Sequence, residues 1–167
     1  MRVLGIDPGL TITGFGCVEG DPVRPRIVEA GVVRLTKGKA RRSLAERLVE
    51  LDEEIRGVIG SCRPDVVALE GMFTNPKHPG TVITMAHGRG VIMLAAQSMG
   101  VGLVELKPAE VKKGVTGSGR ATKDQIQTSV QHLFGLSELP TPADLADALA
   151  IGVCALRRSE VSSSVVG

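Results

Sequence analysis

The chain has 167 residues, 43% hydrophobic and 23% charged, which is the size and composition of one globular domain and excludes a wholly disordered chain. Three residues are Phe and none is Tyr or Trp, which excludes a base-stacking platform for single-stranded nucleic acid. The net charge of +2 is too small to indicate a nucleic-acid partner by itself.

Cysteine usage and hydropathy indicate the compartment. Cys17, Cys62 and Cys154 lie far apart, which argues against a disulfide framework or a zinc knuckle and is typical of a reducing cytosol. The N-terminal run reaches an acid at Asp7 and does not resemble a signal peptide. The uncharged apolar run 148–156 is far shorter than the roughly 20 residues of a membrane span. We therefore expect a cytoplasmic protein that has no membrane partner.

The first 35 residues predict three strands. The apolar run 3–6 stops at Asp7-Pro8-Gly9, and β-prone runs follow over 13–18 and 26–35. Turn residues separate the three runs, as in an antiparallel meander.

Helices alternate with two further strands in the rest of the chain. Ser43 and Glu46 form a capping-box signature at the start of an amphipathic helix. Thr141 and Pro142 predict the N-cap and first residue of the last helix. Between these we expect strands over 65–69 and 101–106 and helices over 81–99, 108–115 and 122–134.

This order predicts an α/β fold. It contains a five-stranded mixed sheet, made of the antiparallel meander and two parallel strands, with helices on both faces. We expect a single domain over residues 1–158 and a flexible tail over 159–167.

Acidic residues occur on three of the predicted apolar elements. Asp7 and Glu70 each end an apolar strand, and Asp144 and Asp147 lie three apart on the last helix, on a shared face. A carboxylate in apolar surroundings is costly unless a cation or a proton compensates it. Taken singly, Asp7 also suits a turn, Glu70 a solvent-facing strand end, and Asp144 the first turn of a helix. Together, the four predict a site for Mg²⁺ or Mn²⁺, which prefer oxygen ligands.

Basic residues surround a glycine-containing loop near residue 117. Lys112, Lys113, Arg120 and Lys123 flank this loop, whose backbone could approach a phosphate closely. Phe73 lies three residues after Glu70 and is either a core residue or an aromatic wedge between bases.

Several motifs then combine in one order along the chain. They are Gly5-Ile6-Asp7-Pro8-Gly9 with Thr13-Gly14-Phe15-Gly16, Leu69-Glu70 with Phe73, Gly88-Arg89-Gly90, Val111-Lys112, Val115 to Gly119 leading to Lys123, and Ala143 to Ala150 with Asp144 and Asp147. In this order and spacing, over residues 1–158, they resemble the RuvC-type Holliday junction resolvases of the ribonuclease-H-like superfamily.

The resemblance implies a ribonuclease-H-like fold and a homodimer that makes paired symmetric nicks at a four-way DNA junction in recombination and repair. Asp7, Glu70, Asp144 and Asp147 match the metal-binding catalytic acids. Lys112 and Lys123 match basic residues around the active site, while Phe73 and Arg89 match positions assigned to DNA contact.

We expect two Mg²⁺ or Mn²⁺ ions in each active site and products with a 5′-phosphate and a 3′-hydroxyl. The branch-migration complex of the same pathway is an expected partner. Two alternatives stay open at this point. One is a non-catalytic junction-binding module, and the other is a related nuclease that acts on RNA or ordinary duplex.

Overall fold

One five-stranded sheet organises the computed structural model, which describes residues 1–35, 42–72 and 79–164. Its strands are β1 (Arg2–Asp7), β2 (Ile12–Gly20), β3 (Pro25–Arg34), β4 (Val66–Glu70) and β5 (Gly102–Leu106), arranged in the order β3-β2-β1-β4-β5. The first three pair antiparallel, whereas β4 runs parallel to both β1 and β5. The predicted mixed sheet is confirmed.

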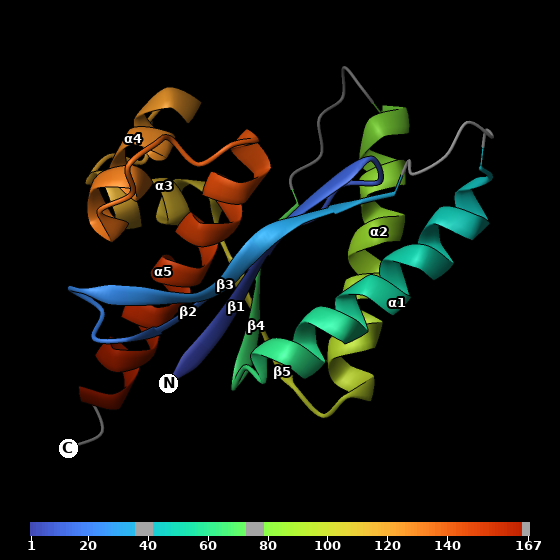
Figure 1. Cartoon of the computed structure of the whole chain (residues 1–167), viewed down its shortest axis with the longest axis horizontal. Helices are drawn as coiled ribbons and strands as arrows, with labels where there is room; N and C mark the ends of the chain where they lie inside the picture. Colours follow the sequence, from blue (N-terminus) through green and yellow to red (C-terminus); the bar gives the residue numbers. More distant parts are fainter. Residues whose placement is uncertain (36–41, 73–78, 165–167) are drawn as a thin grey trace.

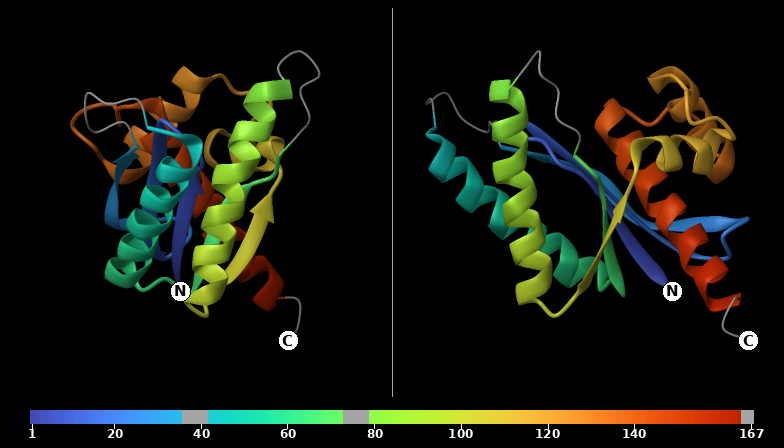
Figure 2. Two further views of the ribbon diagram at one scale, coloured as in Figure 1. Left: turned by 90° about the vertical axis from the view of Figure 1, so that its right-hand side faces the viewer. Right: turned by 180° about the vertical axis from the view of Figure 1, so that it is seen from behind.

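Helices cover both faces of the sheet (Figure 1). One face carries α1 (Leu44–Cys62) and α2 (Pro79–Ser98), and the other carries α5 (Ala143–Ser164), against which α3 (Pro108–Thr116) and α4 (Lys123–Phe134) pack. Figure 2 shows the sheet between the two helical layers. None of the helices in the described ranges is long and apolar enough to cross a membrane.

Capping residues determine where two of the helices begin. The Ser43 hydroxyl accepts from the Glu46 backbone N–H at 3.2 Å, and the Glu46 carboxylate accepts from the Ser43 backbone N–H at 2.7 Å. Thr122 and Gln125 form the same reciprocal pair at the start of α4. The capping box predicted at Ser43 is confirmed, because both of its hydrogen bonds are present.

The last helix begins one residue later than predicted. It begins at Ala143, so Pro142 precedes the first helical residue instead of occupying that position. The Pro142 carbonyl already accepts from the Leu145 backbone N–H at 3.0 Å, which is the role of an N-cap carbonyl. At its far end α5 continues to Ser164.

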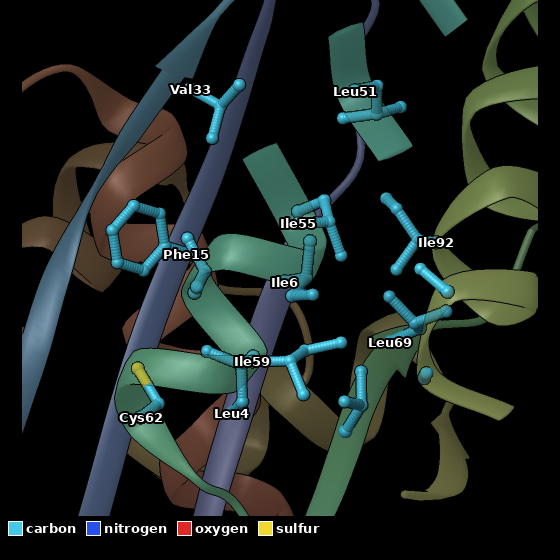
Figure 3. Packing of buried hydrophobic residues seen from close by; sticks show 14 of the residues in the cluster. Leu4, Ile6, Phe15, Val33, Leu51, Ile55, Ile59, Cys62, Leu69 and Ile92 are labelled. Atoms are coloured by element: carbon cyan, nitrogen blue, oxygen red, sulfur yellow. The ribbon is translucent and has the colours of Figure 1, made fainter. Parts of the chain in front are cut away.

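Two hydrophobic layers flank the sheet. Side chains alternate along a strand, so Leu4 and Ile6 of β1 face α1 and α2, while Val3 faces α5. Leu51, Ile55 and Ile92 fill the first layer with large aliphatic side chains (Figure 3). The second layer combines smaller residues of α5 with strand residues and with side chains from α3 and α4.

Glycines let α5 lie very close to β1 and β2. A methyl group added at Gly5 would overlap the carbonyl oxygen of Ala148 and the backbone of Gly152. One added at Gly14 would overlap the carbonyl oxygen of Asp144. The start of α5 therefore rests directly on the sheet, at the strand position that pairs with Asp7.

Candidate active site

Two of the predicted acids end adjacent parallel strands. Ile6 of β1 lies beside Leu69 of β4 in the strand register, so the next residues, Asp7 and Glu70, leave the sheet side by side. Both strands point the same way, and their carboxyl ends therefore meet at one edge. The predicted proximity of these two carboxylates follows directly from the sheet topology.

The other two acids come from the helical layer above this edge. Asp144 lies in the first turn of α5, and Asp147 follows about one turn later. The main chain of Asp144 rests on Gly14, which is the β2 partner of Asp7. Glycine packing thus brings α5 and its acids to the sheet edge that carries Asp7 and Glu70. We refer to Asp7, Glu70, Asp144 and Asp147 as the four-acid cluster.

The charges of neighbouring acids raise the pKa of Asp7, Glu70 and Asp147 within the cluster. Burial and, after it, the charges of Asp147, Asp144 and Glu70 together raise the pKa of Asp7 to about 7. Burial, followed by the charge of Asp147, raises the pKa of Glu70. The pKa of Asp147 is also raised, chiefly by burial. The cluster therefore concentrates negative charge in a partly buried place, which a cation would stabilise.

The donor chemistry of the cluster suits a hard divalent ion. All four groups supply carboxylate oxygens, the ligands that Mg²⁺ and Mn²⁺ prefer. Over residues 1–35, 42–72 and 79–164, however, no three His, Cys, Asp or Glu side chains converge into a ready-made ligand set. An ion bound here would complete its coordination after side chains turn or with oxygens from water or substrate, as in a catalytic site with open positions.

Two lysines border the cluster. Lys123, the first residue of α4, places its Nζ 4.0 Å from Oδ2 of Asp147, and its side chain is 77% exposed. The charges of Lys123 and of Lys112 on α3 both lower the pKa of Glu70 and of Asp147. These lysines therefore add positive charge where a phosphate would approach. Lys113 and Arg120 are exposed on α3 and the following loop.

A cavity of about 260 Å³ opens beside Asp7 and Glu70. Its wall joins these carboxylates to residues of α2 and of the segments after β1, β4 and β5, namely Pro8, Gly71, Met72, Val82, Met85, Arg89 and Pro108. The apolar side chains of Met72, Val82 and Met85 had no signal in the sequence that tied them to the site. The cavity offers a partly apolar recess next to the carboxylates.

Arg89, expected at the DNA by resemblance, lies in the wall of this cavity and is only 7% exposed. Its Nη1 donates to the main-chain oxygen of Glu70 at 2.6 Å, and its Nη2 lies 2.9 Å from Oε2 of Glu105. The guanidinium therefore contacts the Glu70 main chain and the Glu105 side chain of the protein itself. Phe73, the other residue expected at DNA by resemblance, lies outside the described residues.

Comparisons with known proteins show the family and the fold of this chain. The family model for crossover junction endodeoxyribonuclease RuvC matches residues 3–155. Proteins of that name from Syntrophomonas wolfei and Frankia alni are 39% and 47% identical to this chain, covering 98% and 95% of it and 92% and 79% of their own lengths. A solved structure titled T. thermophilus RuvC in complex with Holliday junction substrate superimposes with a TM-score of 0.87 at 29% identity, covering 98% of this chain and 97% of that one. The yeast mitochondrial Holliday junction resolvase Ydc2 shares the fold, with a TM-score of 0.70 at 13% identity over 96% of this chain and 80% of that one.

Proposed function

The chain belongs to the RuvC family of crossover junction endodeoxyribonucleases, and from this premise we propose that it resolves four-way DNA junctions by paired, symmetric nicks. The single observation that supports this activity most strongly is the four-acid cluster, in which β1, β4 and α5 bring Asp7, Glu70, Asp144 and Asp147 together. We assign the activity to residues 1–158 as one nuclease domain.

The four carboxylates would hold two Mg²⁺ or Mn²⁺ ions. Such ions activate a water and stabilise the charge on the phosphate and on the leaving oxygen. Asp7 and Glu70, at the ends of β1 and β4, would supply ligands from the sheet, while Asp144 and Asp147 would supply ligands from α5. The reaction adds water across the phosphodiester bond and leaves a 5′-phosphate and a 3′-hydroxyl.

Lys112 and Lys123 favour the ionised form of the cluster and would also attract the scissile phosphate. Both lower the pKa of Glu70, which helps to keep this ligand deprotonated for metal binding. The exposed ammonium of Lys123 is free to turn toward a phosphate and offset part of the charge of the transition state. We assign Lys113 and Arg120 to contacts with the DNA backbone, and Phe73 to a contact with bases.

A homodimer would supply the second nick. Ile83 and Leu94 on α2 are 59% and 62% exposed, and eleven residues of helix bring them to the same side. We propose this apolar stripe as part of a two-fold contact, which would present two equivalent sites to a pseudo-symmetric junction. The three free, buried cysteines fit the reducing cytoplasm that we propose as its location. The branch-migration complex of the pathway is the partner that we infer.

The decisive experiment offers an end-labelled synthetic four-way junction beside duplex, fork and RNA–DNA hybrid, each with Mg²⁺, Mn²⁺ or EDTA. We expect symmetric paired nicks in the junction alone, which disappear in EDTA. Tight junction binding without cutting in any metal would contradict the nuclease and favour a junction-binding module. Cutting of hybrid or ordinary duplex would instead assign a different substrate to the same site.

A further inference from the structure

Arg89 connects α2 to the end of the strand that carries Glu70. Its Nη1 donates to the main-chain oxygen of Glu70 at 2.6 Å, and its Nη2 lies 2.9 Å from the Glu105 carboxylate on β5. The neighbouring Gly88 lies against Leu10, where an added methyl group would be 3.0 Å from Cδ2. The turn of α2 that carries Arg89 is therefore held closely against the segment between β1 and β2.

We propose that Arg89 is a positioning residue, which holds the Glu70 carboxylate in place by fixing the Glu70–Gly71 peptide and pairing with Glu105. The inference rests on the proposed nuclease function and deepens it. It also replaces the direct DNA contact expected for Arg89 from the family resemblance.

The hydrogen bonds of a single peptide unit support this role. The Glu70 carbonyl accepts from Arg89, and the N–H of the same peptide, on Gly71, donates to the Leu106 carbonyl of β5 at 2.7 Å. The peptide is therefore held on both of its polar sides just after β4 ends. Because the Glu70 side chain leaves the main chain next to this peptide, any rotation of the peptide would move the carboxylate relative to Asp7.

Glu105 is the second partner of the Arg89 guanidinium, after the Glu70 carbonyl. Glu105 pairs with Leu69 in the β4–β5 register, one residue before Glu70, and its side chain is 56% exposed. The guanidinium donates a hydrogen bond to the carbonyl through Nη1 and forms an ion pair with the carboxylate through Nη2. Two separate nitrogens make these contacts, which the single nitrogen of a lysine ammonium cannot do. Arg89 thus ties together α2, the end of β4, and β5.

The contacts of Arg89 go to the main-chain oxygen of Glu70 and to the carboxylate of Glu105. This arrangement favours an effect of Arg89 on the position of the Glu70 carboxylate. Arg89 is almost fully buried, and its two terminal nitrogens already lie against the Glu70 carbonyl and the Glu105 carboxylate. Its contribution to the reaction should therefore appear in how the site accepts metal and not in how the protein holds the junction.

The test compares the wild-type chain with Arg89→Gln, Arg89→Lys, Glu105→Gln and the matched control Arg56→Gln. Arg56 also pairs with a carboxylate, Asp52 at 2.8 Å, but on α1 and not in the cavity wall. For each protein we would measure the junction Kd in EDTA, the Tm in EDTA, the rise in Tm on adding Mg²⁺, and the single-turnover cleavage rate across a Mg²⁺ titration.

We expect Arg89→Gln to reduce the cleavage rate roughly 10- to 100-fold, as is usual when a group that orients a metal ligand is removed. Its Mg²⁺ midpoint should rise and its Mg²⁺-induced gain in Tm should shrink, while the junction Kd stays within about twofold of wild type. Glu105→Gln should change the same quantities less, Arg89→Lys should recover part of the loss, and Arg56→Gln should match wild type.

Other outcomes would overturn the role of Arg89. A weaker junction Kd with an unchanged rate at saturating DNA would identify a DNA contact. A lower Tm with unchanged metal dependence would identify a purely structural residue. If Arg89→Gln does not fold, the Glu105→Gln variant tests the role of Arg89 instead, because the Glu105 carboxylate is exposed and can be neutralised without burying a new polar group. The Mg²⁺-induced gain in Tm is measured without DNA, so it tests the role of Arg89 independently of cleavage. If the wild type cuts no junction, the proposed function is refuted, but the role of Arg89 in metal binding can still be tested.

Discussion

The two faces of the sheet are packed in opposite ways. Toward α1 and α2, large side chains such as Leu51, Ile55 and Ile92 fill the space between the layers (Figure 3). Toward α5, the strands present Gly5 and Gly14, and the helix backbone lies directly against them. The first face keeps its helices at a distance set by side chains, whereas the second brings a helix to the sheet as closely as backbone atoms allow.

Because of this difference, the two faces contribute differently to the stability of the fold and to the geometry of the active site. Removing methylene groups from the α1–α2 layer leaves a cavity but moves no catalytic group. The α5 layer determines how far Asp144 and Asp147 lie from Asp7 and Glu70, so a small shift of the helix changes the acid cluster. We therefore expect changes on the α5 face to affect catalysis. On the opposite face, apart from Arg89 and the other α2 residues of the cavity wall, we expect truncations of the large buried side chains to affect mainly the free energy of unfolding.

The largest effect is expected from Asp7→Asn. This change removes a central ligand of the four-acid cluster, and junction cleavage should fall below detection while the junction Kd is retained. Gel-based cleavage and binding assays on the same preparation would check both. Loss of binding by a folded variant would contradict the assignment of Asp7 to chemistry.

The same variant tests the electrostatics of the metal-free protein. The pKa of Asp7 is about 7 in the folded state and near its ordinary value of 3.8 when unfolded, so the folded state binds the proton more tightly. Stability from this group is therefore full below pH 4 and is lost as the pH rises toward 7, by about 1.4 kcal/mol per pH unit. At pH 8 in EDTA, Asp7→Asn should have a higher Tm than wild type, and at pH 4 the difference should vanish.

Gly5→Ala should break the close packing of α5. The added methyl group would overlap backbone atoms of Ala148 and Gly152, which cannot move aside as a flexible side chain could. We expect a loss of at least about 3 kcal/mol in unfolding free energy, the upper range for overpacking, together with loss of cleavage. Urea unfolding and junction cleavage would measure these two effects.

Gly57→Ala is the matched control on the opposite layer. Gly57 lies inside α1 with nothing within 4 Å of an added methyl group. The change should stabilise the protein by about 0.5–1 kcal/mol, because alanine is the better helix former, and should leave cleavage unchanged. Equal effects of the two alanines would contradict the contrast between the faces.

Ile55→Ala tests the α1–α2 face directly. Ile55 is fully buried, and its truncation should reduce the free energy of unfolding by about 2–5 kcal/mol. Cleavage measured well below the new Tm should stay close to wild type, since none of the four acids lies in this layer. A cleavage defect at a temperature where circular dichroism shows a fully folded variant would show that the two faces are coupled.

Lys123→Met should have the smallest effect on stability. The partner of Lys123 is 4.0 Å away and its own side chain is exposed, so the pair should contribute less than about 1 kcal/mol. Lys123 lowers the pKa of Asp7, Glu70 and Asp147. Its removal should therefore raise these pKa values and move the rising limb of the pH–rate profile to higher pH.

Lys113→Met provides the comparison for that shift. Lys113 is exposed on α3 and is proposed to contact the DNA backbone. Its loss should weaken junction binding and reduce the salt dependence of the Kd without moving the pH–rate profile. An equal pH shift in both variants would show that Lys123 has no specific role at the cluster.

Much of this molecule follows from the sequence by itself. Hydrophobic periodicity and turn residues predict the sheet strands and the helices, because these signals act over a few neighbouring residues. The capping box at Ser43 is a local signal of the same kind. The acids of the site could also be identified from the sequence, since a carboxylate that ends or interrupts an apolar element is recognisable there.

Only the tertiary structure decided which distant backbones meet. Gly5 and Gly14 could equally mark bulges or turns in a strand pattern, and nothing local shows that α5 rests on them. An arginine in a motif shared by a nuclease family suggests DNA contact, yet Arg89 is buried against the Glu70 carbonyl and Glu105. The physical reason is that side-chain type is encoded residue by residue, whereas burial and partner depend on how closely separate elements pack.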